Sequence, residues 1–186
     1  MTWTDTITEQ FALADRFTTD ESDFYGPYNT LLTHVFPHSE HYQVVPQFKG
    51  PVTPGSIDFT TIYIVKKRKL PVMFIEIKTF VSLDDMAARE LADRQMRDCF
   101  TRLLNHLKIP ALYGISAMGT KFAVYKYDAV TRRLTPPVIA RDPEVVNDVA
   151  PAERWTHELM EEGGEQVFND IVEKVKSMCS GITNDP

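Results

Sequence analysis

The sequence predicts a single α/β (α+β) domain with a central mixed β-sheet flanked by helices and with extra C-terminal helices. Strand-like apolar runs alternate with helix-like segments along all 186 residues, with no internal repeat or linker between them. The expected strands are 41–48, 57–65, 71–79, 111–116 and 121–127. The short basic segment Lys66–Lys69 between the second and third strands predicts a hairpin.

The expected helices follow from apolar residues spaced three and four apart. Residues 4–17 begin the chain as a helix, and residues 28–36 form a second that Pro37 ends. Pro46 marks the strand at 41–48 as an edge strand or a bulge. Prolines and glycines at 50–55 then predict a loop.

A long helix from Ser82, its expected N-cap, to about Lys108 follows the hairpin. Residues 128–151 contain four prolines and predict a long loop. A helix over 153–161, a break at Gly163-Gly164 and a last helix complete the chain. The expected core is about 21–127, between the helix at 4–17 and a helical extension at about 152–180.

The composition is that of a globular protein, because 43% of the residues are hydrophobic and 25% are charged. No apolar run approaches the roughly 20 residues that span a bilayer, and residues 1–5 lack the features of a signal peptide. Two cysteines do not make a disulfide framework and fit a reducing compartment. We therefore expect an intracellular protein, cytoplasmic or nuclear, without a membrane partner.

The formal net charge of −6 hides an uneven distribution. Residues 49–133 hold 15 Lys and Arg against 8 Asp and Glu, which makes this span +7. Residues 1–48 sum to −6 and residues 134–186 to −7. A basic middle between acidic ends permits a nucleic-acid partner along the core.

The hairpin brings acidic and basic side chains onto one face of the sheet. If it closes symmetrically around Arg68, the cross-strand pairs are Asp58 with Lys78, Thr60 with Glu76, Ile62 with Phe74 and Ile64 with Val72. A slip of one residue would move Asp58 to the other face. This register predicts two carboxylates and one ammonium group close together.

Such a group of charges is costly to bury without compensation, which a divalent cation would supply. Mg²⁺, or Mn²⁺ in its place, prefers carboxylate oxygens, water and substrate phosphate oxygens. Asp58, Glu76 and the carbonyl of Ile77 are the candidate metal ligands. A metal-bound water can attack phosphorus, and Lys78 would stabilise the charge that develops.

Asp58 followed on the next strand by Glu76-Ile77-Lys78, and then by a helix, resembles the PD-(D/E)xK nuclease superfamily. The resemblance covers roughly residues 21–127 and implies an α–β–β–β–α–β core with the metal site on its second and third strands. The overall sequence pattern is also similar to that of small fungal proteins with this restriction-endonuclease-like fold. The resemblance implies Asp58, Glu76 and Lys78 as catalytic residues of a Mg²⁺-dependent nuclease.

Two accessory residues are also implied by the resemblance. Many members have a glutamate at the start of the first core helix, for which Glu21 is the candidate, with Asp23 behind it. Some have a glutamine on the helix after the lysine strand, matched here by Gln95. The chain departs from the pattern at Cys99, where a tyrosine would stand, and at Ile57, where a proline would precede the aspartate.

Other interpretations remain open at this point. A Glu-x-Lys pair is common on surface strands as a salt-bridge face, and Gln95 could be a buried polar residue without a role in catalysis. The basic turn at 66–69 fits a nuclear-localisation patch, a phosphate contact or a solvated turn. The first hypothesis is a metal-dependent nuclease acting on DNA or RNA. The alternatives are a catalytically inactive binding or interaction module, a homodimer among them, and a regulatory protein in which the hairpin is only scaffold.

Overall fold

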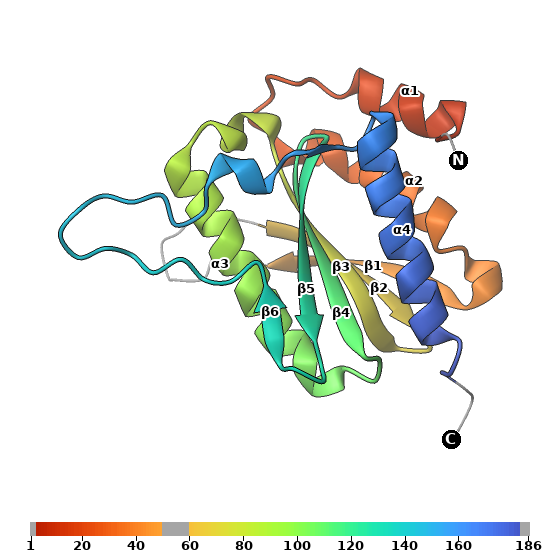
Figure 1. The fold of residues 1–186 in the computed structure, drawn as a ribbon. Helices are drawn as coiled ribbons and strands as arrows, with labels where there is room; N and C mark the ends of the chain where they lie inside the picture. Colours follow the sequence, from red (N-terminus) through yellow and green to blue (C-terminus); the bar gives the residue numbers. More distant parts are fainter. Residues whose placement is uncertain (1–2, 50–59, 183–186) are drawn as a thin grey trace.

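The computed structural model describes residues 3–49 and 60–182, which form one seven-stranded mixed sheet with helices on both faces (Figure 1). The expected fold class is confirmed. The strand order is β1-β2-β3-β4-β5-β6, with β7 paired to β5. The strands are β1 (Tyr42–Lys49), β2 (Thr60–Lys67), β3 (Leu70–Lys78), β4 (Ala111–Met118), β5 (Lys121–Asp128), β6 (Arg133–Thr135) and β7 (His157–Glu158).

The helices divide the core into two apolar layers. The α-helices are α1 (Asp5–Leu13), α2 (Tyr25–Val35), α3 (Met86–Leu103) and α4 (Glu162–Cys179). Side chains of α1, α2 and α4 share one buried cluster with Tyr63, Ile75 and Ile77. Side chains of α3 share the other with Ile62, Ile64 and Phe74. Strand β3 is therefore covered on both faces, which is why it reads as a continuous apolar run.

The hairpin forms as expected, but its predicted register is wrong by two residues. Ile62 pairs with Glu76 and Ile64 with Phe74, where the symmetric closure had placed Phe74 and Val72. The physical reasons are the turn and a bulge. Arg68 and Lys69 both have positive φ, at 51° and 71°, and form a two-residue loop instead of a loop centred on Arg68, which shifts the pairing by one residue. An irregularity between Val65 and Lys66 shifts it by a second residue. Because the shift is even, Glu76 and Lys78 keep the face on which they were expected.

Three helix boundaries differ from the expected ones. Asp85, not Ser82, caps α3 through its contact with the N–H of Ala87 at 2.9 Å, and Ser82 lies in the 3₁₀ turn η3 (Phe80–Leu83). Helix α3 also ends before 108, at Leu103, and continues as η4 (Leu104–His106). Helix α1 ends at Leu13, four residues before the expected end at 17.

The C-terminal extension holds one α-helix, not two, in the described residues. The expected helix at 153–161 is replaced by η5 (Ala152–Arg154) and β7. Gly163 and Gly164 do not break a helix but lie within α4, in its first turn. A Cβ on Gly164 would meet the carbonyl oxygen of Glu158 at 1.9 Å, so this glycine lets α4 approach β7.

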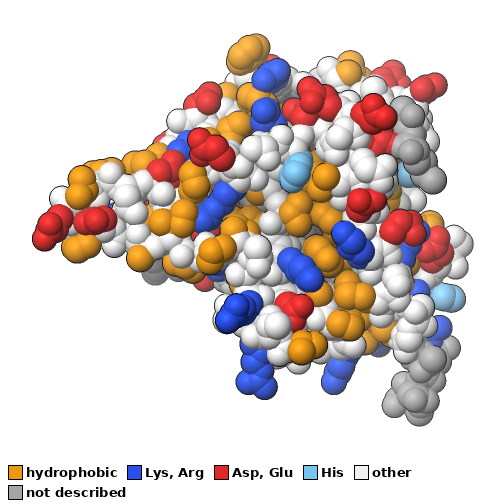
Figure 2. All heavy atoms as spheres, viewed as in Figure 1, with side chains coloured by type: hydrophobic (Ala, Val, Ile, Leu, Met, Phe, Trp, Pro, Cys, Tyr) orange, Lys and Arg blue, Asp and Glu red, His pale blue; other side chains and the backbone are white. Residues whose placement is uncertain are grey.

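Charged side chains separate on the surface in the way that the sequence indicates. Figure 2 shows Asp and Glu side chains over the side formed by α1 and α4, and Lys and Arg side chains near the lower ends of β4, β5 and β6. Among the described residues, none of the helices is both long and apolar enough to cross a membrane.

A buried carboxylate ties α3 to the chain that follows the sheet. Asp93 accepts hydrogen bonds from Arg97 at 2.8 Å, Arg154 at 2.6 Å and the hydroxyl of Tyr125 at 2.8 Å. Burial, followed by the Asp93 carboxylate, raises the pKa of Tyr125 above its usual range. Arg97 follows Asp93 by four residues on the same helix, a spacing at which side chains meet, whereas Arg154 comes from 61 residues away.

We expect Asp93→Asn to lower the free energy of unfolding by about 2 kcal/mol, since it leaves two half-buried guanidinium groups without their counter-charge. Urea denaturation measures this loss. Asp98→Asn, at an exposed position of the same helix, is the control and should change stability by less than about 0.5 kcal/mol. Equal effects of the two substitutions would contradict a structural role for the Asp93 cluster.

Candidate active site at the end of strand β3

Glu76 and Lys78 lie on one face of β3, next to its C-terminal end. Phe74 belongs to the core layer under α3, and Ile75 and Ile77 belong to the opposite layer, so alternation places Glu76 and Lys78 on the α3 side. Glu76 has no exposed surface and Lys78 is 6% exposed. Two charged side chains are thus almost completely removed from water at one end of a central strand.

Glu21 meets Lys78 from a distant part of the chain. The ammonium nitrogen of Lys78 lies 3.1 Å from a carboxylate oxygen of Glu21, whose side chain is 20% exposed. The hydroxyl of Tyr25 donates to the other Glu21 oxygen at 3.3 Å. The structure therefore brings together two of the candidate site residues, which are 57 residues apart in the sequence.

The position of Glu21 depends on how the first core helix begins. Asp20 caps the 3₁₀ turn η1 (Glu21–Phe24), which runs directly into α2, by accepting from the N–H of Ser22 at 2.9 Å. This hydrogen bond also lowers the pKa of Asp20. Glu21 is accordingly the first residue of the segment that leads into the helix, as the resemblance implies.

Two tyrosine hydroxyl groups hold this helix against the sheet. Tyr28 of α2 donates to the carbonyl oxygen of Gly119, beyond the end of β4, at 2.8 Å. Tyr63 of β2 donates to the carbonyl oxygen of Tyr25 at 3.0 Å. The N–H of Gly119 in turn donates to the carbonyl oxygen of Lys78 at 2.9 Å. The end of β3 and the start of α2 are thereby fixed relative to each other.

The other candidate residues of the sequence analysis lie in different surroundings. Gln95 lies on α3, the helix that covers the face of Glu76, and is 3% exposed. Ile77 is buried in the opposite layer, which leaves its backbone carbonyl as its candidate ligand atom. Asp58 lies outside the described residues, and the register that set it opposite Lys78 is not the register that the hairpin forms. Asp23 is exposed in η1.

Ser116 is a polar neighbour of Glu76 that the sequence did not indicate. It pairs with Glu76 across the parallel β3–β4 ladder and is fully buried. Its hydroxyl oxygen accepts from the indole N–H of Trp155 at 3.2 Å. The sequence signal for Ser116 was a polar residue within the otherwise apolar strand 111–118. Its partner Trp155 could not be inferred, because it lies 39 residues further along the chain.

A small hollow of about 210 Å³ lies near the end of β3. Phe11, Phe24, Phe80 and Thr120 line it together with Arg16, whose guanidinium carbon stands 4.0 Å from the centre of the Phe80 ring. Phe80 follows Lys78 by two residues and Phe24 follows Glu21 by three. An exposed cation and aromatic rings therefore lie close in sequence to the candidate site.

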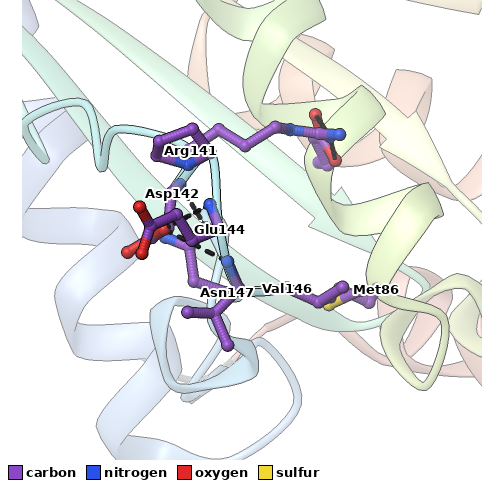
Figure 3. Close-up of a pocket in the computed structure, with 9 residues that line it drawn as sticks. Met86, Arg141, Asp142, Glu144, Val146 and Asn147 are labelled. Carbon is purple, nitrogen blue, oxygen red and sulfur yellow. Dashed lines mark hydrogen bonds and ion pairs between the residues drawn. The ribbon is translucent and has the colours of Figure 1, made fainter.

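A separate hollow of about 540 Å³ lies beside the start of α3, under the long loop after β6 (Figure 3). Its walls are built by hydrogen bonds within the loop, in which Asp142 accepts from the N–H groups of Glu144 and Val145. Arg141 pairs with Glu90 of α3 at 2.6 Å. This hollow belongs to the loop and is distinct from the site on β3.

Among residues 3–49 and 60–182, no group of three or more His, Cys, Asp or Glu side chains is arranged to hold a metal ion. The proposed ligand Asp58 is not among these residues. Comparisons of the chain with protein-family models, curated proteins and solved structures return no match. The chemistry of this site must therefore be argued from its own residues.

The contact between Glu21 and Lys78 predicts an energetic coupling between η1 and β3. In a double-mutant cycle with Glu21→Gln and Lys78→Met, we expect a coupling energy of about 1 kcal/mol or more, because both groups are largely desolvated. Urea denaturation of the four proteins measures it. The more exposed pair Glu40–Lys176, at 3.0 Å, is the control and should couple by less than about 0.5 kcal/mol. A coupling no larger than that of the control would show that Glu21 does not hold Lys78.

Proposed function

We propose that this protein is a metal-dependent nuclease of the PD-(D/E)xK type, which hydrolyses phosphodiester bonds in DNA or RNA. The order of elements supports the proposal, since α2, β1, β2, β3, α3 and β4 follow one another as in the core that the resemblance implies. The parallel pairing of β3 with β4 requires the crossover that α3 provides.

The observation that carries the proposal is the convergence of three residues at one end of β3. Glu76 and Lys78 share a face of the strand, and Glu21 reaches Lys78 at 3.1 Å from the start of the first core helix. Glu76 and Lys78 were selected from the sequence as one motif, and Glu21 was selected through the resemblance. Buried acidic and basic groups that meet in this way are typical of functional sites, although structural ion pairs share the feature.

The donor set at this end of β3 suits a hard divalent cation. Glu76 contributes a buried carboxylate, Ile77 a backbone carbonyl and Asp58, in our proposal, a second carboxylate. When bound, Mg²⁺ or Mn²⁺ would activate a water molecule and polarise the scissile phosphate. Further predictions of the same proposal are an intracellular location, cytoplasmic or nuclear, and a homodimer that light scattering would detect.

Lys78 has the role of an electrostatic group in this proposal. Its ammonium group would stabilise the extra negative charge that develops on the scissile phosphate, and we do not assign it the role of a base. Glu21 is a positioning residue, because it contacts Lys78 and limits where the ammonium group can lie. Gln95 would be accessory, and Arg16 over Phe80 is a candidate contact for the nucleic-acid backbone.

A second candidate function is an inactive nuclease-like module that binds a nucleic acid or a protein. The Glu21–Lys78 ion pair is the observation that favours it, since a lysine already paired with a carboxylate gives less charge to a phosphate. The two functions differ in whether Glu76 and Lys78 are needed for cleavage or only for stability.

A nuclease assay with Mg²⁺ or Mn²⁺ on single- and double-stranded DNA and RNA separates them. We expect cleavage that Glu76→Gln, Lys78→Met and Asp58→Asn each reduce about 100-fold or more, because each removes a charge that acts at the reacting phosphate. Glu21→Gln should reduce it less. Asp23→Asn, an exposed acidic position in the same turn, is the matched control and should leave cleavage unchanged.

Thermal unfolding of every variant must accompany the assay, so that loss of cleavage is not confused with loss of fold. Cleavage that persists in Glu76→Gln and Lys78→Met would contradict the proposed site. No cleavage of any substrate by the wild type, with binding of nucleic acid retained, would favour the inactive module.

A further inference from the structure

The turn between β2 and β3 opens on a hollow that carries an unusual number of cationic side chains. The hollow measures about 360 Å³ and is lined by His38, His41, Tyr42, Gln43, Arg68 and Lys69. It lies at the end of β3 opposite to Lys78, where the hairpin runs beside the C-terminal end of α4 (Figure 1). The nine residues of β3 place it roughly 25 Å from the candidate active site.

The backbone around this hollow is unusual for its sequence. Four non-glycine residues have positive φ among the described residues, and three of them, His41, Arg68 and Lys69, line the hollow. Turns of this kind favour Asn and Gly, since a left-handed conformation strains larger residues. Two long cationic side chains at the two central positions are therefore a costly choice for a turn alone, which suggests a function for them.

The hydrogen-bond donors of Arg68 indicate the kind of ligand. Its Nε and Nη1 atoms are covered from solvent and have no hydrogen-bond acceptor in the described structure. A buried guanidinium donor without an acceptor destabilises the folded protein, and this cost disappears if an anion supplies oxygen atoms. A guanidinium binds a phosphate in a two-point contact through Nε with Nη2 or through Nη1 with Nη2, and each of these donor pairs includes one of the two covered atoms of Arg68.

The charges nearby leave the hollow electropositive. Glu40, in the turn η2 (His38–Glu40), is occupied by Lys176 at 3.0 Å. Lys67 stands 4.6 Å from the centre of the Tyr42 ring. Burial chiefly raises the pKa of Tyr42, with smaller effects of Cys179 and of the carboxylates of Glu40 and Glu173, so its hydroxyl stays neutral.

His38 is held in place by its Nδ1, which lies 3.1 Å from the carbonyl oxygen of Tyr42 and donates to it. Its other ring nitrogen is thereby oriented by the backbone. The polar groups of the hollow therefore come from two separate segments. His38 belongs to the segment that contains η2 and the start of β1, and Arg68 and Lys69 form the hairpin turn.

We propose that this hollow is a binding site for a phosphoryl oxyanion, in which Arg68 makes the two-point contact and Lys69 adds charge. Two sources share this chemistry: a free phosphate or phosphate monoester, and a backbone phosphate of a nucleic acid. The proposal does not depend on cleavage, because the site lies at the other end of the strand from Glu76 and needs no metal.

The test is a titration without divalent metal, at constant ionic strength, followed by amide chemical shifts in NMR. The three ligands are inorganic phosphate, a nucleoside 5′-monophosphate and a single-stranded oligonucleotide. We expect saturable shifts around Tyr42 and the Arg68–Lys69 turn, weakened at least about 10-fold by Arg68→Asn, since a charge-assisted two-point contact is lost. Asn is chosen because it tolerates positive φ.

Arg132→Asn is the matched control, because Arg132 is an exposed arginine at a turn position with φ of 56°. It should bind phosphate like the wild type, and so should Glu76→Gln, which separates this site from the proposed active site. Displacement of phosphate by the oligonucleotide would identify backbone phosphates as a source, whereas binding of the small anions alone would identify free phosphate groups.

Thermal unfolding gives an independent readout. Phosphate should raise the melting temperature of the wild type and of Arg132→Asn more than that of Arg68→Asn. Without phosphate, Arg68→Asn should be no less stable than the wild type, since it removes two buried donors that lack an acceptor. No saturable shift with any of the three anions, or equal losses in Arg68→Asn and Arg132→Asn, would overturn the proposal.

Discussion

Burial of charge in the central strand β3 is the constraint on which the rest of this structure depends. Glu76 has no exposed surface and Lys78 very little, in a strand that is covered on both faces. Charges removed from water in this way must be compensated by nearby groups. Part of the compensation is visible as Glu21, which reaches Lys78 because η1, α2 and two tyrosine hydroxyl groups fix the start of the first core helix at the end of β3. In our proposal a metal ion also contacts Glu76.

The two ends of β3 then differ in their chemistry. The C-terminal end carries Glu76 and Lys78, with Glu21 beside the lysine, and is where we propose a metal-dependent reaction. The other end leads into a two-residue turn made of Arg68 and Lys69, whose exposed and half-covered cations suit an oxyanion. A nucleic acid that contacts both would run along the hairpin, a distance of several nucleotides. The buried polar cluster around Asp93 lies apart from both ends and serves to attach the C-terminal segment to α3.

The sequence predicted the fold class and the order of the core elements, because long apolar runs and clear helical spacing dominate residues 25–128. It failed where a single local choice decided the outcome. The register depended on the left-handed conformation of Arg68 and Lys69, which residue type alone does not favour, and on an irregularity between Val65 and Lys66. Gly164 looked like a helix breaker, but it serves close packing against Glu158. Of the site, Glu21 was found through the resemblance, whereas the Ser116–Trp155 contact joins residues too far apart in sequence to be inferred. The role of Asp58 as a metal ligand remains a prediction.

The central claim is that Glu76 helps to hold a divalent cation at the end of β3. A crystal of the protein soaked in Mn²⁺ tests it directly through the anomalous difference map. The account predicts one strong peak within coordination distance of a Glu76 carboxylate oxygen and of Asp58, with Lys78 beside it. A map without a peak at Glu76, in which the ammonium group of Lys78 instead occupies the space between the carboxylates, would contradict it and favour an inactive binding module.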